Sequence, residues 1–233
     1  MVLLKSMVEH GVDKIVFSST AATYGEPERV PILEDDKTVP TNCYGQTKLS
    51  MEQMMEWVSR AHGLRYVALR YFNACGAHPS GKIGEAHNPE THLIPIILQV
   101  PLEQREAVSI FGDDYPTPDG TCRRDYLHVV DLAKGHLKAI DYAMEHTGAE
   151  AFNLGTGHAV SVLELVNTFM EATGVNVPYV IGPRREGDLP QMWADTHKAE
   201  TVLGWKAEKT VADMCRDSWN WQSHNPDGYK TAE

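Results

Sequence analysis

A tyrosine and a lysine lie four positions apart in the stretch CYGQTKL, at Tyr44 and Lys48. If this stretch is helical, the two side chains share one face of the helix, about 6 Å apart along its axis. A tyrosine phenol is a poor base at neutral pH, because its ordinary pKa is about 10. A nearby ammonium favours the phenolate, and about 4 kcal/mol of such stabilisation makes a phenol a base near neutrality. The pair indicates proton transfer, while a chance pair on a solvated helix has the same spacing.

Hydroxyl side chains precede this pair by about two dozen residues, in the run Ser18-Ser19-Thr20. They follow the apolar residues 15–17, which are typical of a buried parallel strand. Ligands of open parallel sheets bind beyond the carboxyl ends of the strands. The hydroxyls and the Tyr44–Lys48 pair therefore predict a shared site, with backbone capping by the hydroxyls as the structural alternative.

Helix and strand patterns alternate along the chain, which predicts an α/β fold with part of a doubly wound, parallel, Rossmann-type sheet and a smaller α/β lobe. In a helix over residues 1–10, Val2, Leu3 and Met7 could share one face, and Gly11 can end it. Later helices are expected to be closed by Gly63 and capped by Ser161, and Pro95 suits a first turn. The remaining expected segments are helices at about 44–62, 91–100, 128–144 and 160–174, strands at 64–73, 107–111 and 150–157, a loop at 179–195, and a helical tail with Trp205, Trp219 and Trp221.

Composition limits the classes of partner. The chain has 233 residues, 42% of them hydrophobic, and a formal net charge of -11. Such an acidic chain is a poor general partner for nucleic acid or an anionic membrane, so we predict neither. We also expect no signal peptide and no membrane span. Four scattered cysteines without a CxxC pair favour a cytoplasmic location.

The eleven histidines show no spacing typical of metal ligands. His78, His87 and His92 lie in or beside one loop, but without paired cysteines or carboxylates at fixed offsets. The sequence therefore predicts no metal site.

Five stretches in order resemble the UDP-glucose 4-epimerases of the extended short-chain dehydrogenase/reductase family: SSTAATYG, YGQTK, RYFNACGAHPSGKIGE, RRDYLHVVDLAKGH and RREGDLPQMWAD. The resemblance covers essentially the whole chain and implies NAD as cofactor, UDP-glucose and UDP-galactose as substrates, and a homodimer. It also implies a preceding segment with the GxGxxG fingerprint, which this sequence lacks. We therefore expect an N-terminally truncated chain that is inactive or unstable alone. The alternatives are a non-catalytic fragment or a related epimerase that also accepts UDP-N-acetyl sugars.

The resemblance also implies roles for individual residues. Tyr44 takes the proton of the sugar 4-hydroxyl, Lys48 stabilises the phenolate, and Thr20 bridges the 4-oxygen and the tyrosine. Ser18 and Phe72 join these three in the NAD site. The implied substrate residues are Asn73, His92, Leu93, Ser109, Phe111, Arg124, Arg185, Asp188 and Met192. His92 departs from the family, which often has asparagine there, and Phe72 and Phe111 are also typical core residues.

Domain bounds follow from the same resemblance. Residues 1–75 are expected to form the C-terminal part of the NAD-binding Rossmann domain, and residues 76–233 mainly a UDP-sugar lobe, with about 125–150 returning to the first domain. A related dehydratase would carry an Asp-Glu pair after the strand threonine, to supply an acid and a base. Ala21 and Ala22 occupy those positions, which favours epimerisation. Met192, flexible and of intermediate size, leaves the acceptance of N-acetyl sugars open.

Overall fold

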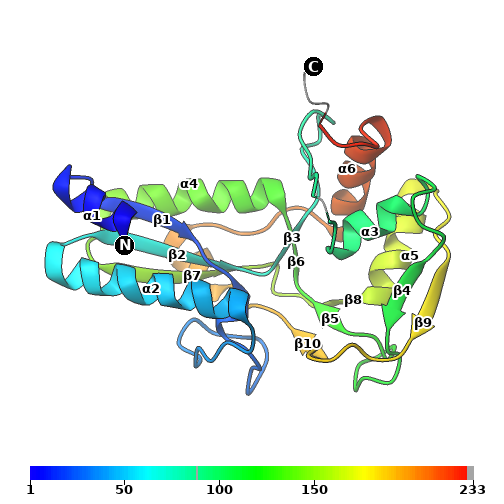
Figure 1. The fold of residues 1–233 in the computed structure, drawn as a ribbon, viewed down its shortest axis with the longest axis horizontal. Helices are drawn as coiled ribbons and strands as arrows, with labels where there is room; N and C mark the ends of the chain where they lie inside the picture. The colour runs from blue at the N-terminus through cyan, green and yellow to red at the C-terminus, as the bar shows by residue number, and fades with distance from the viewer. Residues whose placement is uncertain (88, 230–233) are drawn as a thin grey trace. The chain divides into compact units, whose positions relative to one another are not determined.

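The computed structural model describes residues 1–87 and 89–229 (Figure 1). It divides into two compact units, each built from three chain segments. Unit 1 contains Met1–Phe72, Leu132–Gly157 and Trp193–Ala207, and unit 2 contains Asn73–Asp131, His158–Met192 and Glu208–Glu233. The predicted bounds left residues 193–207 in the second domain. In the structure they join unit 1, where the buried Trp205 lies against Gly135.

A parallel three-stranded sheet, in the order β1-β2-β7, forms the centre of unit 1. In its register Val16 lies beside Val67, and Leu69 lies beside Phe152. This sheet confirms the predicted α/β class. The elements of unit 1 are α1 (Val2–Glu9), β1 (Lys14–Ser18), the 3-10 turn η1 (Ala21–Thr23), α2 (Cys43–His62), β2 (Arg65–Tyr71), α4 (Val129–Glu145, in this unit from Leu132), β7 (Ala149–Leu154) and the π-helical turn η2 (Ala199–Leu203).

Helices cover both faces of this sheet. Successive strand residues point to opposite faces. Ala151 of β7 packs against a cluster that contains Leu4 of α1 and Met55 of α2. The next residue, Phe152, meets the ring of Tyr142 of α4 edge-on, at 5.3 Å between ring centroids. Helices α1 and α2 therefore lie on one face, and α4 lies on the other.

The prediction for the first helix was wrong in its buried face. Leu4 and Met7 are buried, whereas Val2 and Leu3 are 84% and 63% exposed. Five apolar residues in the eight positions of α1 allow two overlapping apolar stripes, and contact with α2 selects the stripe that contains Leu4. The helix ends at Glu9, and Gly11 adopts the expected left-handed conformation two residues later, with φ +68°.

Two later predictions need correction, while the helix ends were placed correctly. Gly63 is the left-handed C-cap of α2, and Ser161 caps α5 in a capping box. Trp205, expected in a helical tail, lies outside the last helix, α6 (Val211–His224). The expected loop at 179–195 contains two short strands, β9 (Tyr179–Gly182) and β10 (Gln191–Met192).

Unit 2 is built from short strands around a helical core. Strand β4 pairs with β9, β3 pairs with β6, and β5 lies between β10 and β8. Its core contains Ile97, Leu165, Phe169 and Met214, which come from its three helices. The elements not yet given are β3 (Asn73–Cys75), α3 (Leu93–Gln99), β4 (Val108–Phe111), β5 (Arg123–Arg124), β6 (Tyr126–His128), β8 (Val160–Ser161) and α5 (Val162–Thr173).

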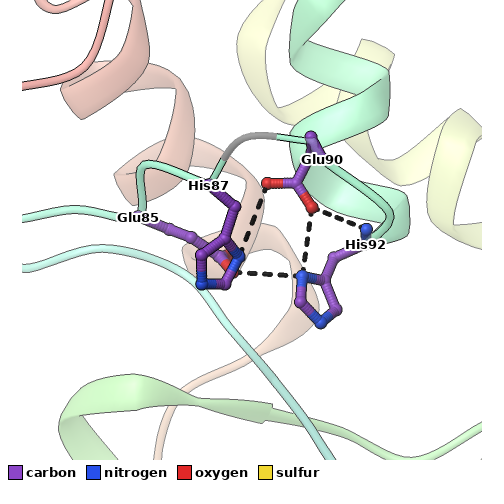
Figure 2. A group of neighbouring side chains, drawn as sticks. All are labelled: Glu85, His87, Glu90 and His92. Carbon is purple, nitrogen blue, oxygen red and sulfur yellow. Dashed lines mark hydrogen bonds and ion pairs between the residues drawn. The ribbon is translucent and has the colours of Figure 1, made fainter.

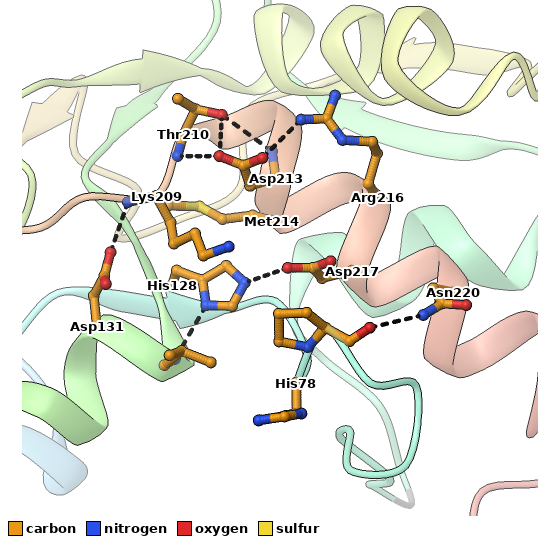
Figure 3. Close-up of polar contacts among 12 residues, drawn as sticks. His78, His128, Asp131, Lys209, Thr210, Asp213, Met214, Arg216, Asp217 and Asn220 are labelled. Atoms are coloured by element: carbon orange, nitrogen blue, oxygen red, sulfur yellow. Dashed lines mark hydrogen bonds and ion pairs between the residues drawn. The ribbon is translucent and has the colours of Figure 1, made fainter.

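Buried polar side chains join β6 to the last segment of unit 2 (Figure 3). His128 accepts a hydrogen bond at Nδ1 from the backbone N–H of Val130, and its Nε2 lies 3.1 Å from Asp217 Oδ2. Burial lowers the pKa of His128, and Asp217 acts in the opposite direction. Asp131 Oδ2 accepts from the backbone N–H of Lys209 at 2.8 Å. These bonds fix the chain on the approach to α6.

Among the residues that the structure describes, no helix combines the length and apolar composition that a membrane crossing requires.

Candidate functional site

The first two turns of α2 carry the predicted tyrosine and lysine. The side chain of Asn42 accepts a hydrogen bond from the N–H of Gly45 at 2.8 Å, which caps the helix. Tyr44 and Lys48 share one face, with Lys48 Nζ 5.6 Å from the centre of the tyrosine ring. Tyr44 is 54% exposed. A ligand can therefore reach the phenol beside the ammonium.

The ammonium of Lys48 is held at the carboxyl end of β1. Its Nζ donates to the backbone oxygen of Ser18 at 2.9 Å and lies 5.2 Å from the centre of the Phe17 ring. A lysine side chain has several rotatable bonds, so this bond restricts where its charge lies. The positive charge therefore stays at the strand end where the sequence predicted a ligand.

Thr20 lies two residues beyond β1, at the start of the turn η1. It is 8% exposed, and its Oγ1 accepts from the backbone N–H of Ala22 at 3.2 Å. The turn contacts the first turn of α2 directly. A Cβ atom added at Gly45 would lie only 2.4 Å from the oxygen of Ala22. The glycine between Tyr44 and Lys48 thus allows the helix to approach the threonine turn backbone to backbone.

Two residues near this end of β1 were missed by the sequence analysis. The Oγ of Ser18 lies 3.0 Å from Nε2 of His136, and the ring of Tyr71 lies 6.2 Å from that imidazole. Burial raises the pKa of Tyr71. His136 lies 118 positions after Ser18, in a separate segment of unit 1, so no local pattern could connect them.

Phe72 follows β2 and is buried, with 8% of its surface exposed. Its backbone N–H donates to the oxygen of Leu154 at 3.2 Å, which extends the pairing of β2 with β7. Its contacts fit a core aromatic, and its predicted place beside a cofactor stays a prediction.

Unit 2 brings four of the predicted substrate residues together. Asp188 accepts from Arg185 Nη2 at 2.8 Å and lies 3.8 Å from Arg124 Nη2. The guanidinium of Arg185 lies 5.6 Å from the centre of the Phe111 ring. The side chain of Arg185 is 63% exposed, whereas that of Arg124 is 19% exposed. Two guanidinium groups thus flank a single carboxylate, and one of them also lies over an aromatic ring.

The hydrogen bonds of this cluster leave guanidinium groups in reach of an anion. Asp188 raises the pKa of Arg185, the more exposed of the two arginines. The more buried one, Arg124, donates to the backbone oxygens of Arg123 at 3.0 Å and Leu189 at 2.7 Å. These bonds hold its guanidinium in place, and planar guanidinium groups match phosphate oxygens bidentately.

Three further predicted residues lie on strands of unit 2. In β4, Ser109 and Phe111 alternate with buried residues and share the exposed face. Met192 of β10 lies beside Arg124 in the strand register. Asn73 of β3 donates its backbone N–H to the oxygen of Asp125, the residue after Arg124, at 2.9 Å.

The last two predicted residues, His92 and Leu93, mark the start of α3. Leu93 packs against the core of unit 2. His92 contacts Glu85 and Glu90 and lies beside His87 (Figure 2). Its observed partners are therefore acidic, a surrounding that the sequence analysis did not foresee.

Known proteins resemble this chain in sequence and in fold. The model of the NAD dependent epimerase/dehydratase family matches residues 1–155. The UDP-glucose 4-epimerase of Halalkalibacterium halodurans is 54% identical over 230 residues, which cover 98% of this chain and 69% of the relative. That of Bacillus subtilis is 51% identical over 234 residues, which cover 100% of this chain and 69% of the relative.

A solved structure agrees with these sequence relatives. The structure of UDP-glucose 4-epimerase from Bifidobacterium longum in complex with NAD+ and UDP matches with a TM-score of 0.92 and 48% identity. The match covers 98% of this chain and 69% of that chain. The parallel sheet of unit 1 and the family match over residues 1–155 agree with the predicted Rossmann-type fold. The chain therefore belongs to the NAD dependent epimerase/dehydratase family.

Proposed function

We propose that this chain carries the catalytic helix and the nucleotide-sugar lobe of a UDP-glucose 4-epimerase, which interconverts UDP-galactose and UDP-glucose. One observation carries the proposal. Lys48 shares a helix face with the exposed phenol of Tyr44 while its Nζ is fixed at the end of β1. That arrangement is a phenol base with a positioned cation, located where parallel sheets bind ligands.

In the proposed reaction Tyr44 takes the proton from the sugar 4-hydroxyl through its phenol oxygen. The ammonium of Lys48 stabilises the negative charge that develops on that oxygen. Thr20 hydrogen-bonds the 4-oxygen, and the cap that its Oγ1 provides to η1 holds its side chain in place. When C4 of the 4-keto sugar is reduced again from either face, Tyr44 returns its proton to the 4-oxygen, and this completes the epimerisation.

The residues at the end of β1 fit NAD. Tyr44, Thr20 and Ser18 offer hydroxyl groups, and Lys48 offers an ammonium, which suit ribose hydroxyls and a carboxamide. Phe72, at the end of β2, is proposed to border the nicotinamide. When bound, NAD supplies the reversible oxidation of the sugar at C4, while the protein supplies orientation and proton transfer.

The cluster in unit 2 is proposed to bind UDP. Arg185 would exchange its bond to Asp188 for the diphosphate, beside Arg124, and free Asp188 to accept from ribose hydroxyls. Phe111 and Ser109 share an exposed strand face on which the uracil ring could stack. Asn73, His92, Leu93 and Met192 are proposed to complete the substrate site.

We further propose a homodimer that acts in the cytoplasm. Apolar side chains exposed on α1 and α2, among them Leu3, Met51 and Trp57, support an interface formed by these helices. Trp57→Glu is then expected to shift a dimer to a monomer in light scattering. The free cysteines, with three of the four buried, support a reducing compartment.

The first test measures bound NAD and the conversion of UDP-galactose by the chain, with and without added NAD. Tyr44→Phe removes the base and should lower turnover about 10²- to 10⁴-fold. Tyr142→Phe, whose ring stacks on His146 elsewhere in unit 1, is the matched control and should change it little. If the unmodified chain converts UDP-galactose, equal activity in the Tyr44→Phe variant would refute the proposed base.

The expectation that the chain is inactive alone is tested by a separate result. A chain that holds no NAD and shows no conversion supports the alternative of a non-catalytic fragment. Robust conversion by a chain whose mass equals that of 233 residues would refute the prediction that it is inactive alone.

A further inference from the structure

Four potential metal ligands converge in unit 2, around the segment that leads into α3 (Figure 2). The ligand atoms of Glu85, His87, Glu90 and His92 all lie within 4.8 Å of one another. In Figure 2 both imidazole rings and both carboxylates turn toward a common point. The sequence analysis predicted no metal site, because ligand offsets of two, three and two residues match no known ligand motif.

The distances fit one small cation. His87 Nδ1 lies 2.9 Å from Glu85 Oε1 and 3.8 Å from Glu90 Oε2. His92 Nδ1 lies 3.2 Å from Glu85 Oε1 and 3.0 Å from Glu90 Oε1. Zinc–ligand bonds to nitrogen and carboxylate oxygen are about 2.0–2.2 Å, so the edges of a tetrahedron around zinc are about 3.3–3.6 Å. Three of these four separations lie below that range and one lies above it, so side-chain rotations would be needed to place the ligand atoms around zinc.

Burial and hydrogen bonding hold one ligand in place. The Glu90 side chain is only 7% exposed. Its Oε1 accepts from the backbone N–H groups of Thr91 and His92, both at 2.7 Å. Such contacts around a ligand orient it and support metal affinity. Beside the cluster lies a cavity of about 190 Å³, lined also by Gln99 and Gln222, through which a hydrated cation could enter.

Charge and ligand chemistry select the class of cation. Two carboxylates and two neutral imidazoles carry a charge of about -2, which balances a divalent ion. Mixed nitrogen and oxygen ligands in a tetrahedral arrangement favour Zn²⁺, whereas Mg²⁺ and Ca²⁺ prefer oxygen ligands alone. We propose that Glu85, His87, Glu90 and His92 bind one Zn²⁺-like divalent cation, which clamps this segment to the start of α3. The proposal rests on the contacts of these four side chains and not on the proposed function, although it shares His92 with the proposed substrate site.

The test uses the full chain without a histidine tag, stripped of metal with EDTA and titrated with Co²⁺. We expect one Co²⁺ per chain with the intense visible absorption of four-coordinate cobalt, and its displacement by Zn²⁺. His87→Gln and His92→Gln should each weaken Co²⁺ binding at least about tenfold, because even residues outside the ligand shell change affinity by that factor. Both imidazoles are more than half exposed, so folding should survive, and circular dichroism checks it.

His78→Gln is the matched control, because it removes an exposed histidine that hydrogen-bonds Ser80 and leaves the four ligands intact. It should bind Co²⁺ as the unmodified chain does. The proposal is overturned if no four-coordinate spectrum appears, or if both ligand variants bind Co²⁺ as tightly as the control. Zn²⁺ should also raise the thermal midpoint of the unmodified chain and leave that of His92→Gln unchanged.

Discussion

A buried ion pair links the catalytic helix to the sheet, and breaking it should cost most of the stability of unit 1. Arg70 of β2 and Glu52 of α2 are joined by three bonds between 2.6 and 3.2 Å, and their side chains are 10% and 6% exposed. The hydroxyl of Ser19 donates to Glu52 Oε1. Because Glu52 lies four residues after Lys48, this contact fixes the helix beside the strand end that Lys48 also reaches.

The other side of the Arg70 guanidinium is also hydrogen-bonded. Its Nη1 donates to the Tyr24 hydroxyl and to the backbone oxygen of Glu34, both at 3.1 Å. Burial raises the pKa of Tyr24 to about 12, so its phenol keeps its proton and donates it to Asn153 Oδ1 at 2.7 Å. Arg70 thus connects α2, β7 and the loop after β1.

The ion pair can be tested with the variant Arg70→Met, which leaves the Glu52 carboxylate buried without its cation. Removing one partner of a buried pair costs about 3–5 kcal/mol. That loss approaches the whole stability of many domains, about 5–15 kcal/mol. Glu52→Leu alone should cost about as much. The double variant removes both charges, so its loss should fall short of the sum of the two single losses by at least about 2 kcal/mol.

Urea denaturation followed by tryptophan fluorescence measures these losses, with the midpoint and slope fitted together. The double variant should be more stable than either single variant. Losses that simply add, or single variants within about 1 kcal/mol of the unmodified chain, would refute the reasoning, because the pair would then be solvated rather than buried.

Four further predictions test local features. Gly45→Ala should lower the free energy of unfolding in urea even though alanine favours helices by about 1 kcal/mol, because its Cβ would collide with the backbone of Ala22; a gain in stability would show that this contact gives way. Ser161→Ala should cost about 1 kcal/mol in the same assay, since it removes the capping box of α5. Hydrogen bonds from Thr210 hold the pKa of Asp213 well below its usual range, so its contribution is full above about pH 3.9 and is lost as pH falls further. Asp213→Asn should therefore be less stable than the unmodified chain at pH 7, and the difference should shrink in acid titrations below about pH 4. A thiol reagent should label one cysteine rapidly, Cys43, because the other three are buried, and all four after unfolding.

Local signals were enough to predict many of the elements but not the contacts between them. Gly63 and Ser161 end and begin helices by their own backbone chemistry, so their positions could be read directly. The stripe of α1 depended on the neighbour that buries it, and the pattern alone did not separate Leu3 from Leu4. Helix ends can be predicted from the sequence because they depend on neighbouring residues and not on tertiary packing.

The candidate site divides in the same way. Tyr44 and Lys48 were readable because helix geometry alone sets their spacing. The contact of Ser18 with His136 spans 118 positions, and the ligand cluster around His92 depends on an irregular loop without periodicity. Contacts of this kind can be seen only in the folded structure and could not be predicted from the sequence.

The interleaved segments of the two units also affect synthesis. The chain passes from one unit to the other five times, and unit 1 receives its last segment, Trp193–Ala207, only after two segments of unit 2 have been translated. A ribosome adds about 5–20 residues per second, and with this segment order it completes neither unit early. The chain therefore cannot fold one domain completely while the next is still being translated. The edge of β2 that faces away from β1 must instead wait for β7, which is translated about 80 residues after β2 ends. For the same reason neither unit could be produced as one continuous piece of the chain.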